Sequence, residues 1–200
     1  MKSILGKKIE MVQYFTEKGE CIPATLIHAE PMTVTQVKTK VLDGYDAVQV
    51  GHGTQKATRL SKGILGHTKG TAFRTLKELS MSETKNVGDV ISIDILQEGD
   101  IVNVRGVSKG KGFQGVVKRH GFKGGRRSHG QKHSEREPGS IGGGLRSRVP
   151  KGMRMAGRMG SDMVQVKNLK VISVDTKNNH ILVSGAIPGR RGTLLEVIGK

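Results

Sequence analysis

The sequence contains few of the residues that usually fill a large core or hold a small one together. Among its 200 residues there is no tryptophan, and there are only two tyrosines, four phenylalanines and one cysteine. The single Cys21 excludes an internal disulfide framework and a zinc site built from several cysteines. The shortage of aromatic side chains indicates that part of the chain contributes little to a folded core.

Long apolar runs are also missing. No stretch approaches the 18 apolar residues that indicate a membrane-spanning helix, so we expect no membrane span. The first ten residues resemble neither a signal peptide nor an arginine-rich transit peptide. A cytoplasmic location is therefore expected.

Acidic residues are half as numerous as basic ones. The chain has 34 Lys and Arg against 17 Asp and Glu, which gives a net charge of +17 and a pI near 10.3. A surplus of this size makes a compact protein repel itself unless a polyanion supplies the missing charge. Nucleic acid is the first candidate for that polyanion, and an anionic membrane surface is the second.

Most of the positive charge lies in one segment, residues 105–160. This segment holds 15 Lys and Arg, two acidic residues and 15 of the 29 glycines, so its net charge is +13 and the remaining residues carry only +4. Its apolar residues are scattered and sustain no helical or strand period for long. They cannot offset an ordering entropy of about 1–2 kcal/mol per residue. We predict a long irregular extension, largely mobile alone and ordered on RNA, rather than a linker with incidental charge.

The rest of the chain is typical of a small β protein. Short runs rich in β-branched residues recur at 22–27, 33–37, 47–50, 90–95, 101–104, 163–166, 169–174 and 180–183. Residues 175–179 have the composition of a hairpin turn, and residues 54–81 are less regular, with room for a short helix. The pattern predicts an antiparallel barrel or sandwich formed by residues 1–104 together with 161–200, with 105–160 inserted.

One glycine motif invites a nucleotide-binding interpretation. Residues 110–115 match G-x-G-x-x-G, and Glu135 lies where a dinucleotide-binding fold places its ribose-binding acid. However, the next residues, V-V-K-R-H-G, do not form the amphipathic helix that opens a βαβ unit. The kinase motifs H-R-D, D-F-G and V-A-I-K are absent, as is the phosphate loop G-x-x-x-x-G-K-[ST]. We therefore expect no nucleotide cofactor and no small-molecule substrate.

Metal and nucleophile patterns are equally weak. His129 and His133 are four residues apart with His120 nearby, but the glycines around them argue against a helix, and no H-E-x-x-H occurs. No serine lies in G-x-S-x-G, and Cys21 opens an apolar run, as a buried small hydrophobe does. We expect no metal site, no catalytic residue and no enzymatic activity.

Five stretches of the sequence resemble one known family. They are V-R-G-V-S-K-G-K-G-F-Q-G-V-V-K-R at 104–119, P-G-S-I-G at 138–142, K-G-M-R-M-A-G-R-M-G at 151–160, G-K-K-I-E-M at 6–11 and V-S-G-A-I-P-G at 183–189. Together they are similar to the bacterial form of the universal large-subunit ribosomal protein L three family, over essentially the whole chain.

The resemblance implies a specific architecture and role. Its globular part would be a small antiparallel β-barrel like those of translation factors, and its extension would penetrate large-subunit ribosomal RNA toward the peptidyl transferase centre. It implies a protein that acts early in subunit assembly, beside other large-subunit ribosomal proteins, and performs no chemistry. The tip implied by motif position is Ser140, Ile141, Gly142, Gly143, Gly144, Leu145, Arg146, Ser147, Arg148, Val149 and Pro150. This tip lacks the methylated glutamine that bacterial relatives often carry.

Within the extension, cationic and imidazole side chains are the expected contacts to ribosomal RNA, because they neutralise phosphates or stack on bases. They are Lys109, Lys111, Lys118, Arg119, His120, Lys123, Arg126, Arg127, His129, Lys132, His133, Arg136, Arg146, Arg148, Lys151, Arg154 and Arg158.

Two other functions remain open at this stage. A DNA-compacting protein would have similar electrostatics, and it would bind duplex DNA as tightly as large-subunit RNA at matched salt. A nucleotide-using enzyme would take up NAD, ATP or GTP in equilibrium dialysis.

Overall fold

The computed structural model describes residues 2–80, 85–144 and 147–200. Two compact units are formed, one by Met1–Val107 with Met163–Lys200 and the other by Ser108–Asp162. The charge pattern placed the ends of the extension at 104/105 and 160/161, a few residues from the ends of the second unit. The strand that leads into the extension continues to Val107, and the strand that returns from it begins at Met163.

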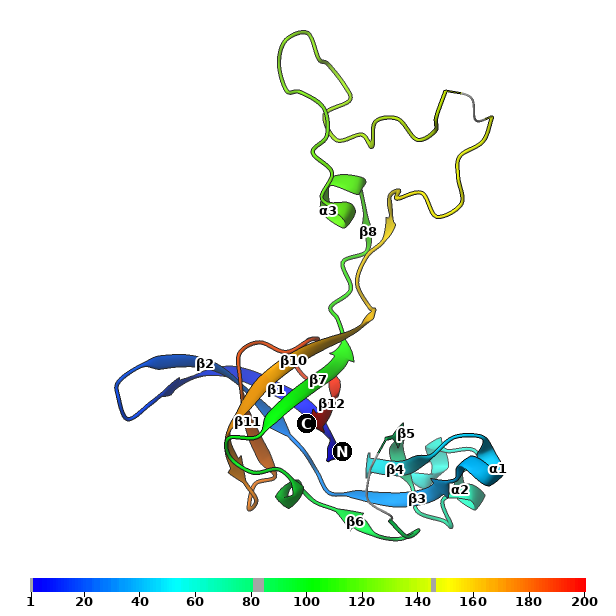
Figure 1. The fold of residues 1–200 in the computed structure, drawn as a ribbon. Coiled ribbons are helices and arrows are strands. Elements are labelled where there is room, and N and C mark those ends of the chain that lie inside the picture. Colours follow the sequence, from blue (N-terminus) through cyan, green and yellow to red (C-terminus); the bar gives the residue numbers. More distant parts are fainter. Residues whose placement is uncertain (1, 81–84, 145–146) are drawn as a thin grey trace. The chain divides into compact units, whose positions relative to one another are not determined.

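Six strands of the first unit pair in a closed ring (Figure 1). They are β1 (Ser3–Phe15), β2 (Cys21–His28), β7 (Ile101–Val107), β10 (Met163–Asp175), β11 (His180–Ser184) and β12 (Leu194–Gly199). Their order is β1-β12-β7-β10-β11-β2, and every pairing is antiparallel. Closure leaves the ring without the unpaired strand edges that promote aggregation. The prediction of a mainly β protein is confirmed.

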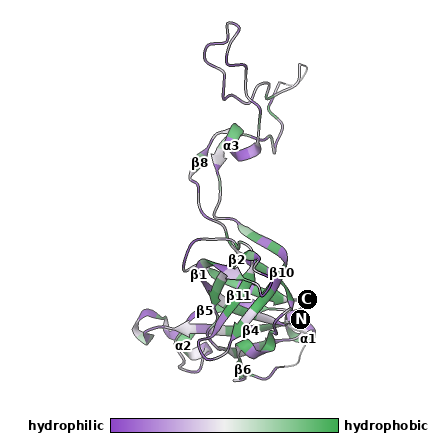
Figure 2. Cartoon of the chain, turned by 90° about the vertical axis from the view of Figure 1, so that its left-hand side faces the viewer, coloured by the Kyte–Doolittle hydropathy of each residue, from purple (hydrophilic) through white to green (hydrophobic). Residues whose placement is uncertain are grey.

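Alternating burial explains why these residues form strands. In β7, Val102 and Val104 are fully buried, whereas Ile101 and Val107 are about half exposed. The same period of two places Ile181 and Val183 of β11 in the core. Figure 2 shows the hydrophobic residues concentrated in the strands of this unit, whereas the extension is largely hydrophilic.

A second sheet shares this core. It consists of β3 (Met32–Lys38), β4 (Ala47–Thr54), β5 (Phe73–Leu79) and β6 (Val90–Ile91), in the order β5-β4-β3-β6. Buried residues of this sheet, among them Met32 and Val50, belong to the same hydrophobic cluster as Ile4 and Val197 of the ring. The sequence did not predict this separate sheet, because nothing in the individual strands says which neighbours they pair with.

Short helical turns complete the first unit. They are α1 (Lys40–Asp43), α2 (Lys62–His67) and two 3₁₀ turns, Ala57–Arg59 and Ile93–Ile95. The strand predicted over 90–95 was therefore wrong beyond Ile91. Ile93 is buried there from a 3₁₀ turn, so its apolar side chain reaches the core without strand pairing. The short helix allowed for within 54–81 corresponds to α2.

Candidate RNA interface

The base of the second unit is a hydrogen-bonded stem, which we define as residues 108–122 and 153–162. In it β8 (Phe113–Gln114) pairs antiparallel with β9 (Gly157–Arg158). The Lys111 amide donates to the Met159 carbonyl and the Met159 amide donates to the Gly112 carbonyl, both at 3.0 Å. The expectation of a wholly irregular extension was therefore wrong at its base. Here two segments more than 40 residues apart pair, and sequence periodicity cannot detect such pairing.

A one-and-a-half-turn helix, α3 (Val116–His120), follows β8. Val116 is 3% exposed and anchors the helix in the stem. Gly121, with a φ of 73°, ends the helix in the left-handed conformation. The basic side chains in its last turn oppose the partial negative charge of the helix C-terminus.

Two predicted RNA contacts help to hold this stem together. The Arg119 Nη1 donates to the Met155 carbonyl at 2.8 Å, and the His120 Nε2 lies 3.1 Å from the same oxygen. A Cβ at Gly157 would lie 2.5 Å from the Arg119 guanidinium, so a glycine is needed where this side chain crosses the backbone. Arg119 and His120 are accordingly only partly exposed.

Five of the predicted RNA contacts line one cavity of about 550 Å³ within the stem. The residues that line it include Lys109, Lys111, Arg119, His120 and Arg158. The acidic residue in its lining is Asp162, whose carboxylate forms an ion pair with the Arg158 guanidinium at 3.3 Å. Four guanidinium or ammonium groups around one open depression attract an anion strongly, and the stem pairing brings them together from both ends of the extension. The charge of this depression therefore favours an anion over a neutral ligand.

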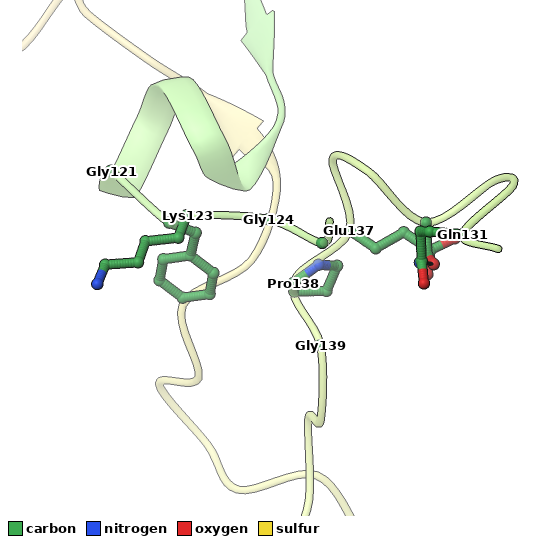
Figure 3. A pocket seen from close by; sticks show the side chains of 10 residues that line it. Gly121, Lys123, Gly124, Gln131, Glu137, Pro138 and Gly139 are labelled. Atoms are coloured by element: carbon green, nitrogen blue, oxygen red, sulfur yellow. Dashed lines mark hydrogen bonds between the residues drawn. The ribbon is translucent and has the colours of Figure 1, made fainter. Parts of the chain in front are cut away.

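Residues 123–152 form a loop in which no described residue belongs to a helix or strand. Its first half closes on itself: the Gly125 amide donates to the Glu135 carbonyl at 3.0 Å, and the Arg127 Nε lies 2.6 Å from the Glu135 carboxylate. An open pocket of about 530 Å³ lies at this closure. In Figure 3 the Lys123 side chain points away from Gln131 and Glu137, which lie on the other side of the pocket.

Most of the predicted contacts are exposed cations and imidazoles. The exposed ones are Lys109, Lys111 and Arg158 of the stem cavity, together with Lys118, Lys123, Arg126, Arg127, His129, Lys132, His133, Arg136, Arg148, Lys151 and Arg154. Leu145 and Arg146 lie outside the described residues. In the described part of the tip, Ser140 Oγ donates to the Gly142 carbonyl at 2.8 Å, and Ile141 and Val149 are 38% and 41% exposed. Contact with RNA stays a prediction for all of them.

Metal-ligating groups do not converge in the described parts of the chain, where no three His, Cys, Asp or Glu side chains are placed to share an ion. His129 has a φ of 60°, so it and His133 do not share a helical face. No helix among residues 2–80, 85–144 and 147–200 is long and apolar enough to cross a membrane.

A second group of exposed cations lies outside the extension, and the sequence reasoning missed it. Lys56, Arg59, Lys62, Lys69 and Arg74 surround α2 and the start of β5, and all are exposed. Residues 55–75 contain no acidic residue, and the structure gives these five cations no ion pair with any described residue. A charge count over a 20-residue window would have found this group. Outside residues 105–160 the positive charge of this group is hidden by acidic residues elsewhere, which lower the net charge of that part of the chain to +4.

The chain is similar to known proteins over nearly its whole length. The family described as Ribosomal protein L3 matches residues 55–181. The large ribosomal subunit protein uL3 of Herpetosiphon aurantiacus is 51% identical over 98% of this chain and 95% of its own length. The chain belongs to the ribosomal protein L3 family. The uL3 proteins of Lactococcus lactis and Finegoldia magna are 46% and 44% identical, each over 98% of this chain and over 96% and 97% of their own lengths.

Membership of the L3 family confirms the resemblance carried by the sequence motifs. Proteins of this family are structural and not catalytic, so the prediction that the chain is not an enzyme is confirmed as well. The G-x-G-x-x-G match at 110–115 lies in the stem, where it includes β8 and ends just before α3.

Proposed function

We propose that this protein is a structural constituent of the large ribosomal subunit and binds large-subunit ribosomal RNA through residues 105–160. The observation that carries the proposal is the cluster of Lys109, Lys111, Arg119 and Arg158 around one open depression in the stem. The loop beyond it adds further exposed cations and few acids. The names of the similar proteins, all large-subunit ribosomal proteins, support the same role.

The mechanism is electrostatic. Where RNA helices converge, their phosphates repel one another, and inserted cations screen that repulsion while releasing counterions to the solvent. Arginine suits the task because its planar guanidinium forks onto phosphate oxygens and stacks on unpaired bases. With 6–10 phosphate contacts, RNA affinity should fall by roughly 10³–10⁵ between 50 and 200 mM salt. The stem would fix the direction of the extension, and the glycine-rich loop would follow the RNA surface.

Several finer features belong to this proposal. The ring of the first unit would be a translation-factor-like barrel on the subunit surface, and the extension would lead its tip, residues 140–150, toward the peptidyl transferase centre. The protein would join the subunit early in assembly, beside other large-subunit proteins, in the bacterial cytoplasm. The cations around α2 would bind RNA at a second place, which would steady the first unit against rotation about the extension.

Sedimentation of the tagged full-length chain with large subunits from a cell extract tests the proposal. Replacing Arg126, Arg127, Arg146 and Arg148 together by Ala should leave melting of the first unit nearly unchanged and reduce the amount of chain in large subunits. A matched variant with the same change of charge, in which Lys167, Lys170, Lys177 and Arg191 become Ala, should be incorporated better. Absence of the wild-type chain from large subunits, or equal affinity for duplex DNA at matched salt, would contradict the proposal.

A further inference from the structure

At the far end of the β1–β2 hairpin, residues 11–15 and 21–22 pair within the hairpin and, among the described residues, with no third strand. β1 pairs with β12 only as far as Lys7, and β2 pairs with β11 only from Ala24 onward. Glu10–Phe15 pair with Cys21–Leu26, with Phe15 opposite Cys21, and of these residues only Ala24–Leu26 also pair with β11. Figure 1 shows this ribbon projecting beyond the other strands of its unit. We call residues 10–23 the distal hairpin.

Large apolar side chains are exposed on this ribbon. Phe15 is 64% exposed, Met11 50% and Tyr14 37%. Strand alternation places Met11 and Phe15 on one face, together with Cys21 opposite Phe15. Cys21 is itself exposed, so the expectation that it is buried was wrong, because its strand has left the core. Two strands alone are only marginally stable in water, so a partner bound to these apolar side chains would stabilise this end of the hairpin.

The charge of the distal hairpin indicates what kind of molecule would bind to its apolar face. In a chain of net charge +17, the distal hairpin carries Glu10, Glu17 and Glu20 against one Lys18, a net of −2. The structure gives the three glutamate side chains no ion pair with any described residue. RNA phosphates would be repelled by such a surface, whereas a basic surface would be attracted to it. Phenylalanine, tyrosine and methionine are also side chains enriched in protein–protein contacts.

We propose that the distal hairpin is the docking surface for a basic protein of the same large subunit, and not for RNA. The apolar face of Met11 and Phe15 would fill a hydrophobic patch on that protein, while Glu17 and Glu20 meet its cations at the rim. The inference rests on the proposed function, because it requires the chain to be placed in the large subunit. It divides the surface of this protein by charge: the extension and the cations around α2 face RNA, and the distal hairpin faces protein.

Cys21 makes the proposal directly testable, because it is the only thiol of the chain and lies beside Phe15. The full-length chain, carrying a photoactivatable cross-linker on Cys21, is reconstituted into large subunits that are purified by sedimentation before irradiation. We expect a nuclease-resistant adduct with one segment of a basic large-subunit protein. Phe15→Ser should lower the adduct yield about tenfold, the loss typical of truncating an interface hot spot. The double variant Glu17→Gln with Glu20→Gln should also lower it.

Two controls separate specific effects from general ones. Val41→Ser removes an apolar side chain that is 93% exposed on α1, and it should leave the adduct unchanged. Gln97→Lys with Gln165→Lys raises the net charge by the same amount as the glutamate variant, at exposed positions away from the hairpin, and it should also be without effect. Circular dichroism of each full-length variant excludes loss of folding as the cause.

Each remaining outcome points to a different conclusion. An adduct with ribosomal RNA alone, or an adduct whose yield neither hairpin variant changes, overturns the docking proposal. So does the absence of any adduct in subunits that contain the labelled chain. If the labelled and unlabelled chains both fail to sediment with large subunits, the proposed function itself fails, and this result is distinguishable from the others before irradiation.

Discussion

Gly160 holds the returning strand of the stem in a conformation that no other residue can adopt cheaply. Its φ is 79°, and an added Cβ would lie 2.2 Å from the Lys109 carbonyl oxygen, closer than real Cβ atoms approach. Gly160→Ala therefore incurs two costs. The left-handed conformation costs about 1–2 kcal/mol for alanine. The backbone must also shift and break the two hydrogen bonds between Lys111, Met159 and Gly112, at about 0.5–1.5 kcal/mol each.

Gly112 provides a matched control in the same stem. Its φ is 67°, but nothing lies within 4 Å of an added Cβ. Gly112→Ala should thus cost only the conformational part, and Gly160→Ala should cost about 1–3 kcal/mol more, which is the sum of the two hydrogen bonds. Amide hydrogen exchange at Lys111 and Met159 in the full-length chain measures this difference directly. Exchange should be faster in Gly160→Ala than in Gly112→Ala, while melting of the first unit stays unchanged in both. Equal exchange rates at Lys111 and Met159 in the two variants would show that a Cβ at position 160 does not break these two hydrogen bonds, which would refute the predicted difference.

Two predictions concern polar groups buried in the first unit. His52 is 1% exposed, and burial lowers its pKa below the usual 6.5 although Glu30 partly opposes this. The unfolded chain therefore binds this proton more readily, so stability is full above pH 6.5 and falls as the pH drops below it. The melting temperature should decrease from pH 7.5 to 5.5, and the decrease should be smaller in His52→Leu. Lys77 Nζ lies 2.8 Å from Glu196, whose side chain is 8% exposed. Lys77→Met should cost about 1–3 kcal/mol in denaturant unfolding, whereas adding Glu196→Leu should recover much of it, and no recovery would refute the pairing argument.

The strands that could be predicted are those whose burial follows the local pattern. Residues 101–104 alternate, though less strictly than 90–95, and residues 180–183 are rich in β-branched residues; both are strands with alternating burial. β1 escaped prediction because it carries Lys7, Lys8 and Glu10 around a bulge between Lys8 and Glu10, which breaks the alternation. β12 escaped because its buried Glu196 interrupts an otherwise apolar run, and only the distant Lys77 makes that burial tolerable. Both failures come from contacts between residues far apart in the sequence.

The candidate site was predictable in composition and not in geometry. The charge of residues 105–160 can be counted, and the motifs at 104–119 and 151–160 resemble one family, which the comparisons confirm. The depression lined by Lys109, Lys111 and Arg158 depends on pairing across more than 40 residues. The same holds for the distal hairpin, since exposed apolar residues in a strand look identical in sequence to buried ones.

The strand register shows that the extension is an insertion into a hairpin, and this has a testable consequence. Val107 of β7 is paired with Met163 of β10, and beyond them the Ser108 amide donates to the Asp162 carbonyl at 2.9 Å. Ser108 and Asp162 are thus close enough to flank a two-residue turn. Replacing residues 109–161 by Asn-Gly should close the hairpin, because the type I′ turn of Asn-Gly matches the twist of paired strands.

The first unit contains the whole of the large hydrophobic cluster, so the shortened chain should fold and melt within a few degrees of the full-length protein. Its affinity for large-subunit RNA at 200 mM salt should fall steeply, because the deletion removes 14 Lys and Arg with two acids and lowers the net charge from +17 to +5. Calorimetry and filter binding measure the two properties separately. Should the shortened chain fail to fold although its hairpin can close, the extension would have to stabilise the first unit, and the division between a folded ring and an RNA-binding insertion would be wrong.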